Sequence, residues 1–340
     1  MTEKAVSRIK TCIVPANVVN TAEILMNKNV LGVIEFSNNT KNYGDAFSKS
    51  NMPYLQISIK PFLHESYFEV WYSSRDVVYG KFKDLQYATD GYHFFGAISM
   101  EETVGPLDHI GKTMYNHIFE SMREFEYPHI FRLWNYLPYI NDFSQGTERY
   151  KLFCHGRASS FQNNSTELIY PSATGVGTWG NCVNIYFIST INNIHKNIEN
   201  PKQTPAYRYP SVNGLKAPSF SRGTYSEYSQ DANSFYISGT ASILGHQTAF
   251  EGDIKKQCET TIANIDSLIS KVNLLSYGIN QEYNLKDLDC IKVYIKNNAD
   301  FEVVKSICED AFSLSKSIVY LNTDICRKNL LVEIEGLIQR

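Results

Sequence analysis

The stretch Asp324–Gly336, which reads DICRKNLLVEIEG, decides how the rest of the sequence is interpreted. If its second half is a strand, the aliphatic side chains that alternate from Leu330 share one face, because strand side chains repeat every second residue. Glu333 and Glu335 then share the opposite face. A solvated sheet face explains most such pairs of glutamates. The alternative is that one carboxyl group is buried and stays protonated, which would make it a general acid.

The composition is that of a packed protein with an unusual number of aromatic residues. The 340 residues are 43% hydrophobic and 20% charged, so the chain can form one large domain or two ordinary ones. Aromatic residues make up 13%, which favours extensive β-sheet and a tyrosine-lined pocket. The net charge of −3 and the lack of a basic run give no reason to expect a nucleic-acid partner.

The cysteines and histidines indicate neither disulfides nor a metal site. The seven cysteines are scattered, odd in number and never spaced as CxxC, and no HxH or HxxxH pair occurs. The first apolar stretch is short and is broken by Pro15 and Asn17, which does not fit a signal peptide or a membrane span. We therefore expect reduced thiols, a cytoplasmic location and no membrane partner.

Two passes through the same order of elements follow each other from Tyr92 onward. Each pass reads strand, helix, strand, helix, strand, strand, and before them lies a strand-rich region of about 90 residues. The expected helices are Asp108–Glu124, Gly146–Phe161, Gly252–Val272 and Phe301–Phe312. The expected strands are Leu31–Phe36, Tyr54–Lys60, Tyr67–Ser73, Tyr92–Met100, His129–Leu137, one beginning within Glu167–Gly177, Cys182–Thr190, Phe235–Ile243, Cys290–Lys296, Ser317–Leu321 and Leu330–Leu337. The sequence thus predicts an α+β fold of two similar halves, each a mixed β-sheet covered by helices on one face.

These elements divide the chain into three parts. Residues 1–200 form an N-terminal half that includes the strand-rich entry region, and residues 231–340 form the C-terminal half. Between them, residues 201–230 are rich in proline and tyrosine. We expect this connector to be a loop packed over the junction of the halves.

The C-terminal half resembles the RidA/YjgF family of enamine and imine deaminases. The resemblance rests on YISGTASILGHQT from Tyr236, EGDIKKQCETTIANIDSLIS from Glu251 and LLVEIEG from Leu330. In that family the first glutamate of the terminal EIE lies in the ligand pocket, and here it is Glu333. The deaminases hold the substrate carboxylate with an arginine on the penultimate strand, and SIVYLN (317–322) contains none. Imine deaminase activity is therefore not expected.

A second resemblance covers most of the chain from Tyr92. Its motifs, in chain order, are LWNYLPYIN (133–141), ERYKLFCHGR (148–157), PSATGVG (171–177), NPKQTPAYRYP (200–210) and APSFSRG (217–223). Together they are similar to the chorismatases, which join a RidA-like C-terminal half to a related N-terminal half. The resemblance implies that chorismate is the substrate and that its enolpyruvyl ether is cleaved to release pyruvate. It implies no cofactor, and no sequence feature supports a metal, a flavin or a nicotinamide.

The resemblance gives roles to one glutamate and several cationic or phenolic side chains. Chorismate carries two carboxylates, and arginine offers each a planar fork of donors that lysine cannot. Arg149 and Arg157 are eight residues apart, so on one helix they lie on roughly the same face, with Tyr150 beside them. Taken alone, two such arginines are more simply read as surface or salt-bridging residues; with the resemblance they are substrate clamps. Tyr207 and Arg222 in the connector are further substrate-binding candidates, and the strand residues expected as alternatives are Arg132 and Arg327.

The chemistry requires a neutral acid, because the enolpyruvyl methylene carbon is a poor base. Glu333 is the candidate, with a pKa raised by burial. Gly239 and Cys326 are the positions that sort product types in the resembling family, and this pair is similar to the 3-hydroxybenzoate-forming type. The simpler alternative is that Gly239 only permits close packing of the strands and that Cys326 is a small core residue.

Two alternative functions and one alternative oligomeric state stay open at this point. One is hydrolysis of chorismate to pyruvate and a dihydroxycyclohexadiene carboxylate. Another is a RidA-like protein that binds a small carboxylate without catalysis. Duplicated halves satisfy contacts internally, so we expect a monomer, with a trimer as the alternative.

Overall fold

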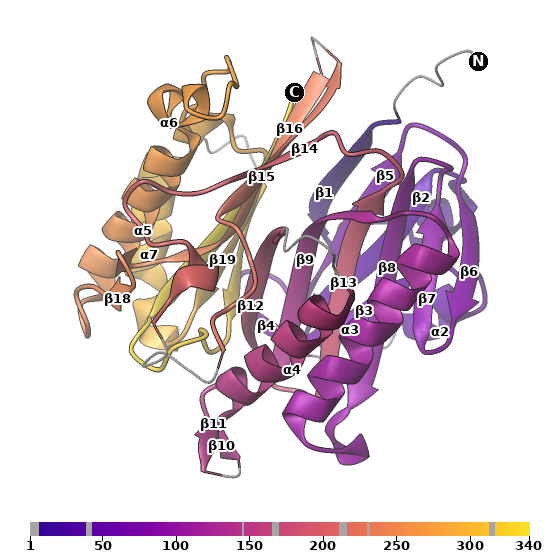
Figure 1. The fold of residues 1–340 in the computed structure, drawn as a ribbon, viewed down its shortest axis with the longest axis horizontal. Helices are drawn as coiled ribbons and strands as arrows, with labels where there is room; N and C mark the ends of the chain where they lie inside the picture. The colour runs from indigo at the N-terminus through magenta and orange to yellow at the C-terminus, as the bar shows by residue number, and fades with distance from the viewer. Residues whose placement is uncertain are drawn as a thin grey trace.

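The computed structural model shows three β-sheets around a common core, with the helices on the outside (Figure 1). It describes residues 7–38, 43–144, 146–164, 170–210, 216–229, 232–312 and 317–340. Within these ranges no helix is long and apolar enough to cross a membrane. The three sheets define three structural units, numbered here in chain order.

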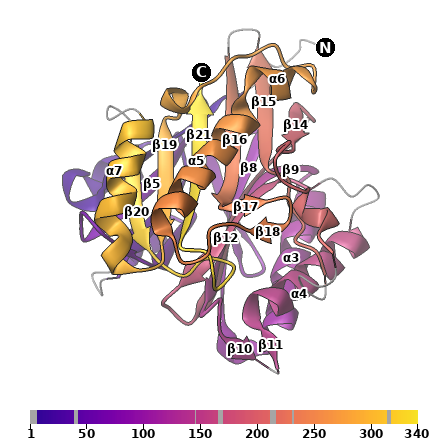
Figure 2. The same ribbon diagram turned by 90° about the vertical axis from the view of Figure 1, so that its left-hand side faces the viewer.

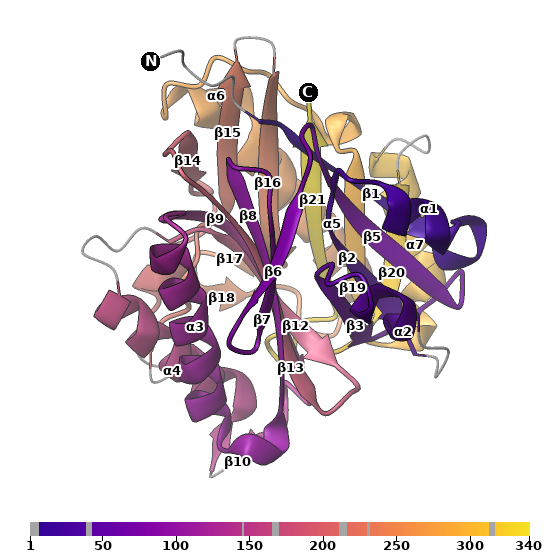
Figure 3. The same ribbon diagram turned by 90° about the vertical axis from the view of Figure 1, so that its right-hand side faces the viewer.

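Unit 2 is a six-stranded sheet with two long helices on its outer face. Its elements are β6 (Val78–Phe82), β7 (Leu85–Thr89), β8 (His93–Glu101), α3 (Leu107–Glu124), β9 (His129–Pro138), α4 (Arg149–Asn164), β12 (Ser172–Thr178) and β13 (Cys182–Thr190). The strand order is β12-β9-β13-β8-β7-β6. A short hairpin, β10 (Phe143–Ser144) with β11 (Thr147–Glu148), leads into α4. Figure 3 shows α3 and α4 side by side, outside the strands.

Unit 3 contains the stretch with which the sequence analysis began. Its elements are β14 (His195–Ile198), β15 (Gly223–Ser229), β16 (Ala232–Ala241), a hairpin of β17 (Ile243–Leu244) and β18 (Gln247–Thr248), α5 (Ile254–Ile269), α6 (Lys271–Leu275), β19 (Cys290–Ile295), α7 (Phe301–Ala311), β20 (Ser317–Asn322) and β21 (Val332–Gln339). The strand order is β14-β15-β16-β21-β19-β20, and β4 (Lys60–Pro61) adds a seventh strand at the β20 edge. Helices α5 and α7 cover one face of this sheet (Figure 2).

The two halves expected from the sequence are confirmed by their topology. The order β8-β13-β9-β12 in unit 2 matches β16-β21-β19-β20 in unit 3, with the connecting helices in the same places. In each unit the edge strand pairs in parallel and the other two pairings are antiparallel. The repeat of element order seen in the sequence therefore reflects a repeated fold.

The N-terminal region is a third copy of this unit, which the sequence analysis treated only as a strand-rich entry. Unit 1 consists of β1 (Ile9–Pro15), α1 (Thr21–Met26), β2 (Val30–Ser37), α2 (Gly44–Ser48), β3 (Tyr54–Ser58) and β5 (Ser66–Ser73). Its strand order, β1-β5-β2-β3, has the same pattern of parallel and antiparallel pairs. Its helices have only six and five residues, too few for a helical period to be recognised in the sequence.

The units meet in a ring in which each edge strand packs on the first strand of the next unit. The amide of Gly239 in β16 donates to the hydroxyl of Thr174 in β12 at 3.1 Å, which joins unit 2 to unit 3. The hydroxyl of Ser317 in β20 donates to the carbonyl of Ile13 in β1 at 2.7 Å, which joins unit 3 to unit 1. The ring is closed by packing of β3 against β8. A central apolar cluster draws side chains from all three sheets, while each unit also has a core under its own helices.

Two expectations about local structure are corrected. The connector at residues 201–230 is not all loop, because β15 within it pairs with β14 and β16 in the unit 3 sheet. The single helix expected over Gly252–Val272 is two, because Ser270 has extended backbone and its side chain caps α6. The strand expected within Glu167–Gly177 begins at Ser172, and residues 167–169 lie outside the described part of the chain.

Candidate active site

Glu333 is the second residue of β21, a central strand of its sheet, and it lies between the sheets of units 2 and 3. The alternation expected from the sequence is confirmed for Val332 and Ile334, which face the core under α5 and α7 while Glu333 faces the other way. Leu330 precedes the strand and belongs to the central cluster instead. Hydrogen-bonded strands flank it on both sides, with Ala241 and Tyr294 as its register partners. This central position fixes the backbone of Glu333 and so the direction of its side chain.

The carboxyl group of Glu333 is buried without an ionic partner. Its residue is 3% exposed, and it forms no ion pair within the described residues. Burial, together with the charge of Glu335, raises its pKa to about 8, because Arg222 and Arg132 offset only part of their effect. At neutral pH this side chain is therefore a protonated acid.

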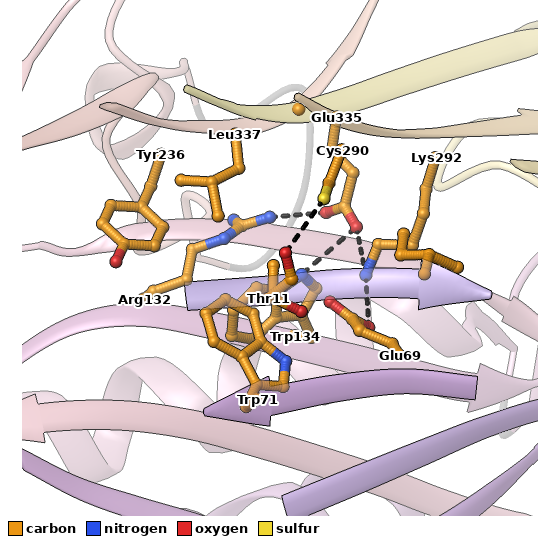
Figure 4. A pocket seen from close by; sticks show the side chains of 12 residues that line it. Thr11, Glu69, Trp71, Arg132, Trp134, Tyr236, Cys290, Lys292, Glu335 and Leu337 are labelled. Carbon is orange, nitrogen blue, oxygen red and sulfur yellow. Dashed lines mark hydrogen bonds and ion pairs between the residues drawn. The ribbon is translucent and has the colours of Figure 1, made fainter. Parts of the chain in front are cut away.

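Glu335, two residues further on, has the opposite surroundings (Figure 4). Its carboxylate accepts from Arg132 at 2.5 Å and lies 2.6 Å from Nζ of Lys292. It also accepts from the indole of Trp134 and the hydroxyl of Tyr294, each at 3.2 Å, and from the hydroxyl of Thr174. Burial alone would raise its pKa, but Lys292 and Arg132 outweigh burial and lower it. The two carboxyl groups therefore differ in charge, and only Glu333 can donate a proton.

The cavity beside Glu335 is too small to be the substrate site. Its volume is about 20 Å³, and its polar lining includes Glu69 and Lys292 together with Arg132. A cavity of this size holds about one water molecule.

Arg157 is a buried arginine whose guanidinium has no carboxylate partner within the described residues. It lies on α4, is 2% exposed, and makes no ion pair within the described chain. Its Nη2 contacts the sulfur of Cys154 at 3.8 Å, while its Nε is buried without a hydrogen-bond partner there. Tyr150 lies on the same helix, and the charges of Cys154, Cys326 and Arg157 all act on its hydroxyl. Cys326 thus links Arg157 and Tyr150 to Glu333, because the Cys326 sulfur is 4.0 Å from Oε2 of Glu333.

Arg222 supplies a second buried guanidinium from the segment that enters β15. It is 2% exposed and donates to the carbonyl of Thr204 at 3.1 Å and the hydroxyl of Tyr209 at 2.6 Å. Its Nε is buried without a partner among the described residues, and its charge acts on both Glu333 and Cys326. The connector therefore places a cation near Glu333 and Cys326, and its part in substrate binding stays a prediction.

Gly239 and Cys326 both border the carboxyl group of Glu333. A Cβ atom at Gly239 would overlap Oε1 of Glu333, so only glycine leaves room for this side chain. The carboxyl group of Glu333 itself fills the space beside Gly239, so this space is not free for movement of a substrate ring. Cys326 is held in place because the amide of Gly177 in β12 donates to the carbonyl of Asp324 at 2.8 Å.

Two sequence candidates lie further from this group. The guanidinium of Arg149 is ion-paired with Glu102, and its Nε donates to the carbonyl of Pro138 at 3.0 Å. The two arginines of α4 therefore do not form one clamp. Tyr207 is half-buried and packs against Tyr170 in a tilted arrangement, with ring centroids 5.0 Å apart.

The alternative arginines also have other partners. Arg132 is bound to Glu335, and Arg327 lies in a turn instead of a strand, where it donates to the carbonyl of His246 at 3.0 Å. The sequence analysis missed the buried cation Lys292. A usable signal was present, because this lysine stands alone within the apolar strand CIKVYI (290–295).

Comparison with known proteins agrees with this geometry. The sequence model described as "Chorismatase FkbO/Hyg5-like, N-terminal" matches residues 69–189. A 3-hydroxybenzoate synthase of Streptomyces hygroscopicus is 39% identical over 321 residues, covering 92% of each chain. A chorismatase of the same organism is 33% identical over 276 residues, covering 81% of this chain and 80% of the relative.

The whole structure has a solved counterpart as well. A chorismatase crystal structure superimposes with a TM-score of 0.89 at 29% identity, covering 98% of this chain and 99% of the other. The match includes all three units, since so little of either chain lies outside it. The sequence identity, the coverage and the shared structure show that this chain belongs to the chorismatase family.

Proposed function

We propose that this protein cleaves chorismate to pyruvate and 3-hydroxybenzoate, with Glu333 as the general acid. The observation that carries the proposal is a buried carboxyl group with a pKa near 8 between two sheets. Such a group is protonated at neutral pH and can deliver its proton to carbon in a water-poor site. The 3-hydroxybenzoate synthase among the relatives supports the product.

The proposed reaction begins with transfer of the Glu333 proton to the methylene carbon of the enolpyruvyl group. The double bond supplies the electron pair for the new C–H bond, and positive charge develops at the ether carbon. The neighbouring ring hydroxyl then displaces pyruvate from the ring carbon, so pyruvate keeps the ether oxygen as its carbonyl oxygen, and the hydroxyl releases its proton as its oxygen bridges the two ring carbons. Opening of this epoxide at the carbon that first carried the hydroxyl, with loss of a C–H proton and protonation of the oxygen, makes the ring aromatic and leaves one hydroxyl group at position 3. Chorismate contains all the atoms of both products, so no co-reactant is required.

Binding is proposed to use two guanidinium groups, one for each carboxylate of chorismate. Arg157 and Arg222 are supported because both are buried and free of ion pairs within the described residues. Arg222 acts electrostatically on Glu333 and Cys326, whereas Arg157 lies beside Cys154 and Tyr150. Tyr150 and, at the edge, Tyr207 complete the proposed wall. Arg149 is engaged by Glu102, so we assign it to the packing of α4.

The test is to incubate the protein with chorismate, follow pyruvate with lactate dehydrogenase, and identify the aromatic product by chromatography. Glu333→Gln keeps the shape of the side chain but cannot donate the proton, and loss of a general acid costs about 10²–10⁴-fold in rate. Near-normal pyruvate release by this variant would contradict the role of Glu333. A dihydroxycyclohexadiene carboxylate as the main product would contradict the product assignment, and binding of chorismate without pyruvate release would favour a non-catalytic carboxylate-binding protein.

We further propose that the protein acts as a monomer in the cytoplasm on a small-molecule substrate. Support for a monomer comes from the three units, which bury their inner faces against one another. Support for a reducing compartment comes from the seven cysteines, all of which are free thiols.

A further inference from the structure

Two carboxyl groups with opposite charge states lie on one face of the same strand. Glu333 and Glu335 are two residues apart, which corresponds to about 6.6 Å along a strand. Both are buried, at 3% and 2% exposure. At this distance in a protein interior, two like charges interact by about 2.5 kcal/mol at an effective dielectric constant of 20.

We propose that Glu335 is a positioning residue whose fixed negative charge keeps Glu333 protonated and thereby sets the pH range of catalysis. The proposal rests on the function proposed above, in which Glu333 is the acid. Glu335 has no free lone pair for substrate, because five side chains contact its carboxylate. Its effect on the reaction must therefore pass through Glu333.

The titratable and charged groups around Glu333 come from several packed elements, among them β19, which contributes its register partner Tyr294. Strand β9 contributes Arg132, the segment entering β15 contributes Arg222, and the turn before β21 contributes the thiol of Cys326. Strands β16 and β12 contribute the uncharged Gly239 and Thr174. Both arginines favour the ionised form of Glu333, so they oppose the state that the reaction needs.

Glu335 counters this pull in two ways. Its own charge disfavours a second carboxylate nearby, and its contact with Arg132 neutralises the cation of β9. Without Glu335, the guanidinium of Arg132 would be left to stabilise the Glu333 carboxylate instead.

The charge of Glu335 is held in place by residues from all three units. Lys292 in unit 3 lies between Glu335 and Glu69 of unit 1, at 2.6 and 2.9 Å. The hydroxyl of Tyr186 in unit 2 donates to Glu69 at 2.7 Å. With Arg132 the group contains two cations and two carboxylates, so its net charge is zero, as burial requires.

The test is the pH dependence of kcat/KM for chorismate in Glu335→Gln. Catalysis needs protonated Glu333, so the rate falls as pH rises through the pKa of that group. Removing the Glu335 charge should move this alkaline limb down by about one to two pH units. Glu335→Asp, which restores the charge, should bring the limb back towards that of the wild type.

Glu69→Gln is the matched control, because it removes a buried carboxylate from the same group at the far side of Lys292. A merely structural role of the group predicts that both glutamine variants lower the melting temperature and leave the limb unchanged. The proposal predicts that both lower the melting temperature while only Glu335→Gln moves the limb. An unmoved limb in Glu335→Gln would overturn it.

Two further measurements keep the outcomes distinct. If Glu335→Gln does not fold, Glu335→Gln/Lys292→Met removes one charge of each sign and avoids an unpaired ammonium, and the same downward shift is expected. Glu333→Gln is assayed in parallel across the pH range. Pyruvate release by that variant would remove the function on which the proposal rests, whereas an inactive Glu333→Gln with an unshifted double variant would overturn the present proposal alone.

Discussion

At the scale of single residues, the site depends on what surrounds each carboxyl group and not on the residue type. Glu333 and Glu335 have the same side chain, strand and face, yet one has a raised pKa and the other a lowered one. The difference arises because Lys292 and Arg132 form ion pairs with Glu335, whereas neither pairs with Glu333 within the described residues. A neutral acid beside an ionised carboxylate is an arrangement suited to proton transfer.

The raised pKa of Glu333 predicts that this residue lowers stability at alkaline pH. Its pKa is about 4.3 in an unfolded chain and about 8 here, so the folded state binds the extra proton between these values. Stability contributed by that proton is present at low pH and is lost as pH rises from about 4.3 to 8. The free energy of unfolding of Glu333→Gln should therefore exceed that of the wild type at pH 8.5 by on the order of a few kcal/mol, and its melting temperature should be higher. At pH 4.5 little difference is expected. Equal melting curves at both pH values would show that Glu333 is not buried as an acid.

Gly239 and Cys326 give a second prediction at this scale. Gly239→Ala alone should lower kcat by displacing the Glu333 carboxyl group, because the new methyl overlaps Oε1. Gly239→Ala/Cys326→Gln adds an amide that can hold a water molecule, which a thiol does poorly. Chromatography of its products should show an increased share of dihydroxycyclohexadiene carboxylate; an unchanged ratio would mean that these positions only pack.

At the scale of elements, helix α4 joins structural and binding roles at different positions. Arg149 at its first residue is tied to Glu102 and to Pro138, whereas Arg157 two turns later is buried without a carboxylate partner within the described chain. Strand β12 organises the same region, since it binds Gly239 through Thr174 and holds the turn that carries Cys326.

The two arginines of α4 should therefore respond differently to substitution. Arg157→Ala should weaken chorismate binding by about 1.5–3 kcal/mol, the range for a hydrogen bond to a charged group. Arg157→Lys should restore only part of this, since lysine lacks the planar fork. Arg149→Ala should lower the melting temperature and leave KM close to that of the wild type. Comparison of KM and thermal unfolding in the three variants decides the assignment, and a raised KM in Arg149→Ala would return this residue to the site.

At the scale of the whole molecule, three copies of one fold surround a single axis, but only one interface carries the chemistry. Glu335, Tyr186 and Glu69 occupy equivalent positions in units 3, 2 and 1, as their strand registers show. Two residues earlier in each strand, Glu333 is replaced by Asn184 and Tyr67. Neither replacement is an acid, so a second or third site of this type is not available in the described structure.

This arrangement predicts one substrate site in a chain that does not need to oligomerise. Light scattering should give a mass close to 38.8 kDa, and titration with 3-hydroxybenzoate should reach one equivalent per chain. A trimer mass would show that the inner faces do not account for all the contacts of the fold. Binding of three equivalents would contradict the loss of function at the other interfaces.

Much of this molecule was determined by local sequence pattern. The alternation around Glu333, the amphipathic helix α3 and the repeated order of elements each follow from side-chain periodicity, which a single sequence displays. The family motifs named the same glutamate, glycine and cysteine that the structure brings together. These features are local, so they survive without knowledge of distant contacts.

Other features were decided only by tertiary structure, because they depend on contacts between residues far apart in the chain. Unit 1 was not recognised as a repeat, since its short helices carry no clear period. The pairing of Lys292 with Glu69 and Glu335 spans more than 200 residues on one side, and no spacing rule predicts it. For the same reason the sequence could show that Arg149 and Arg157 share a helix, but not that Glu102 binds the first while the second has no carboxylate partner within the described residues.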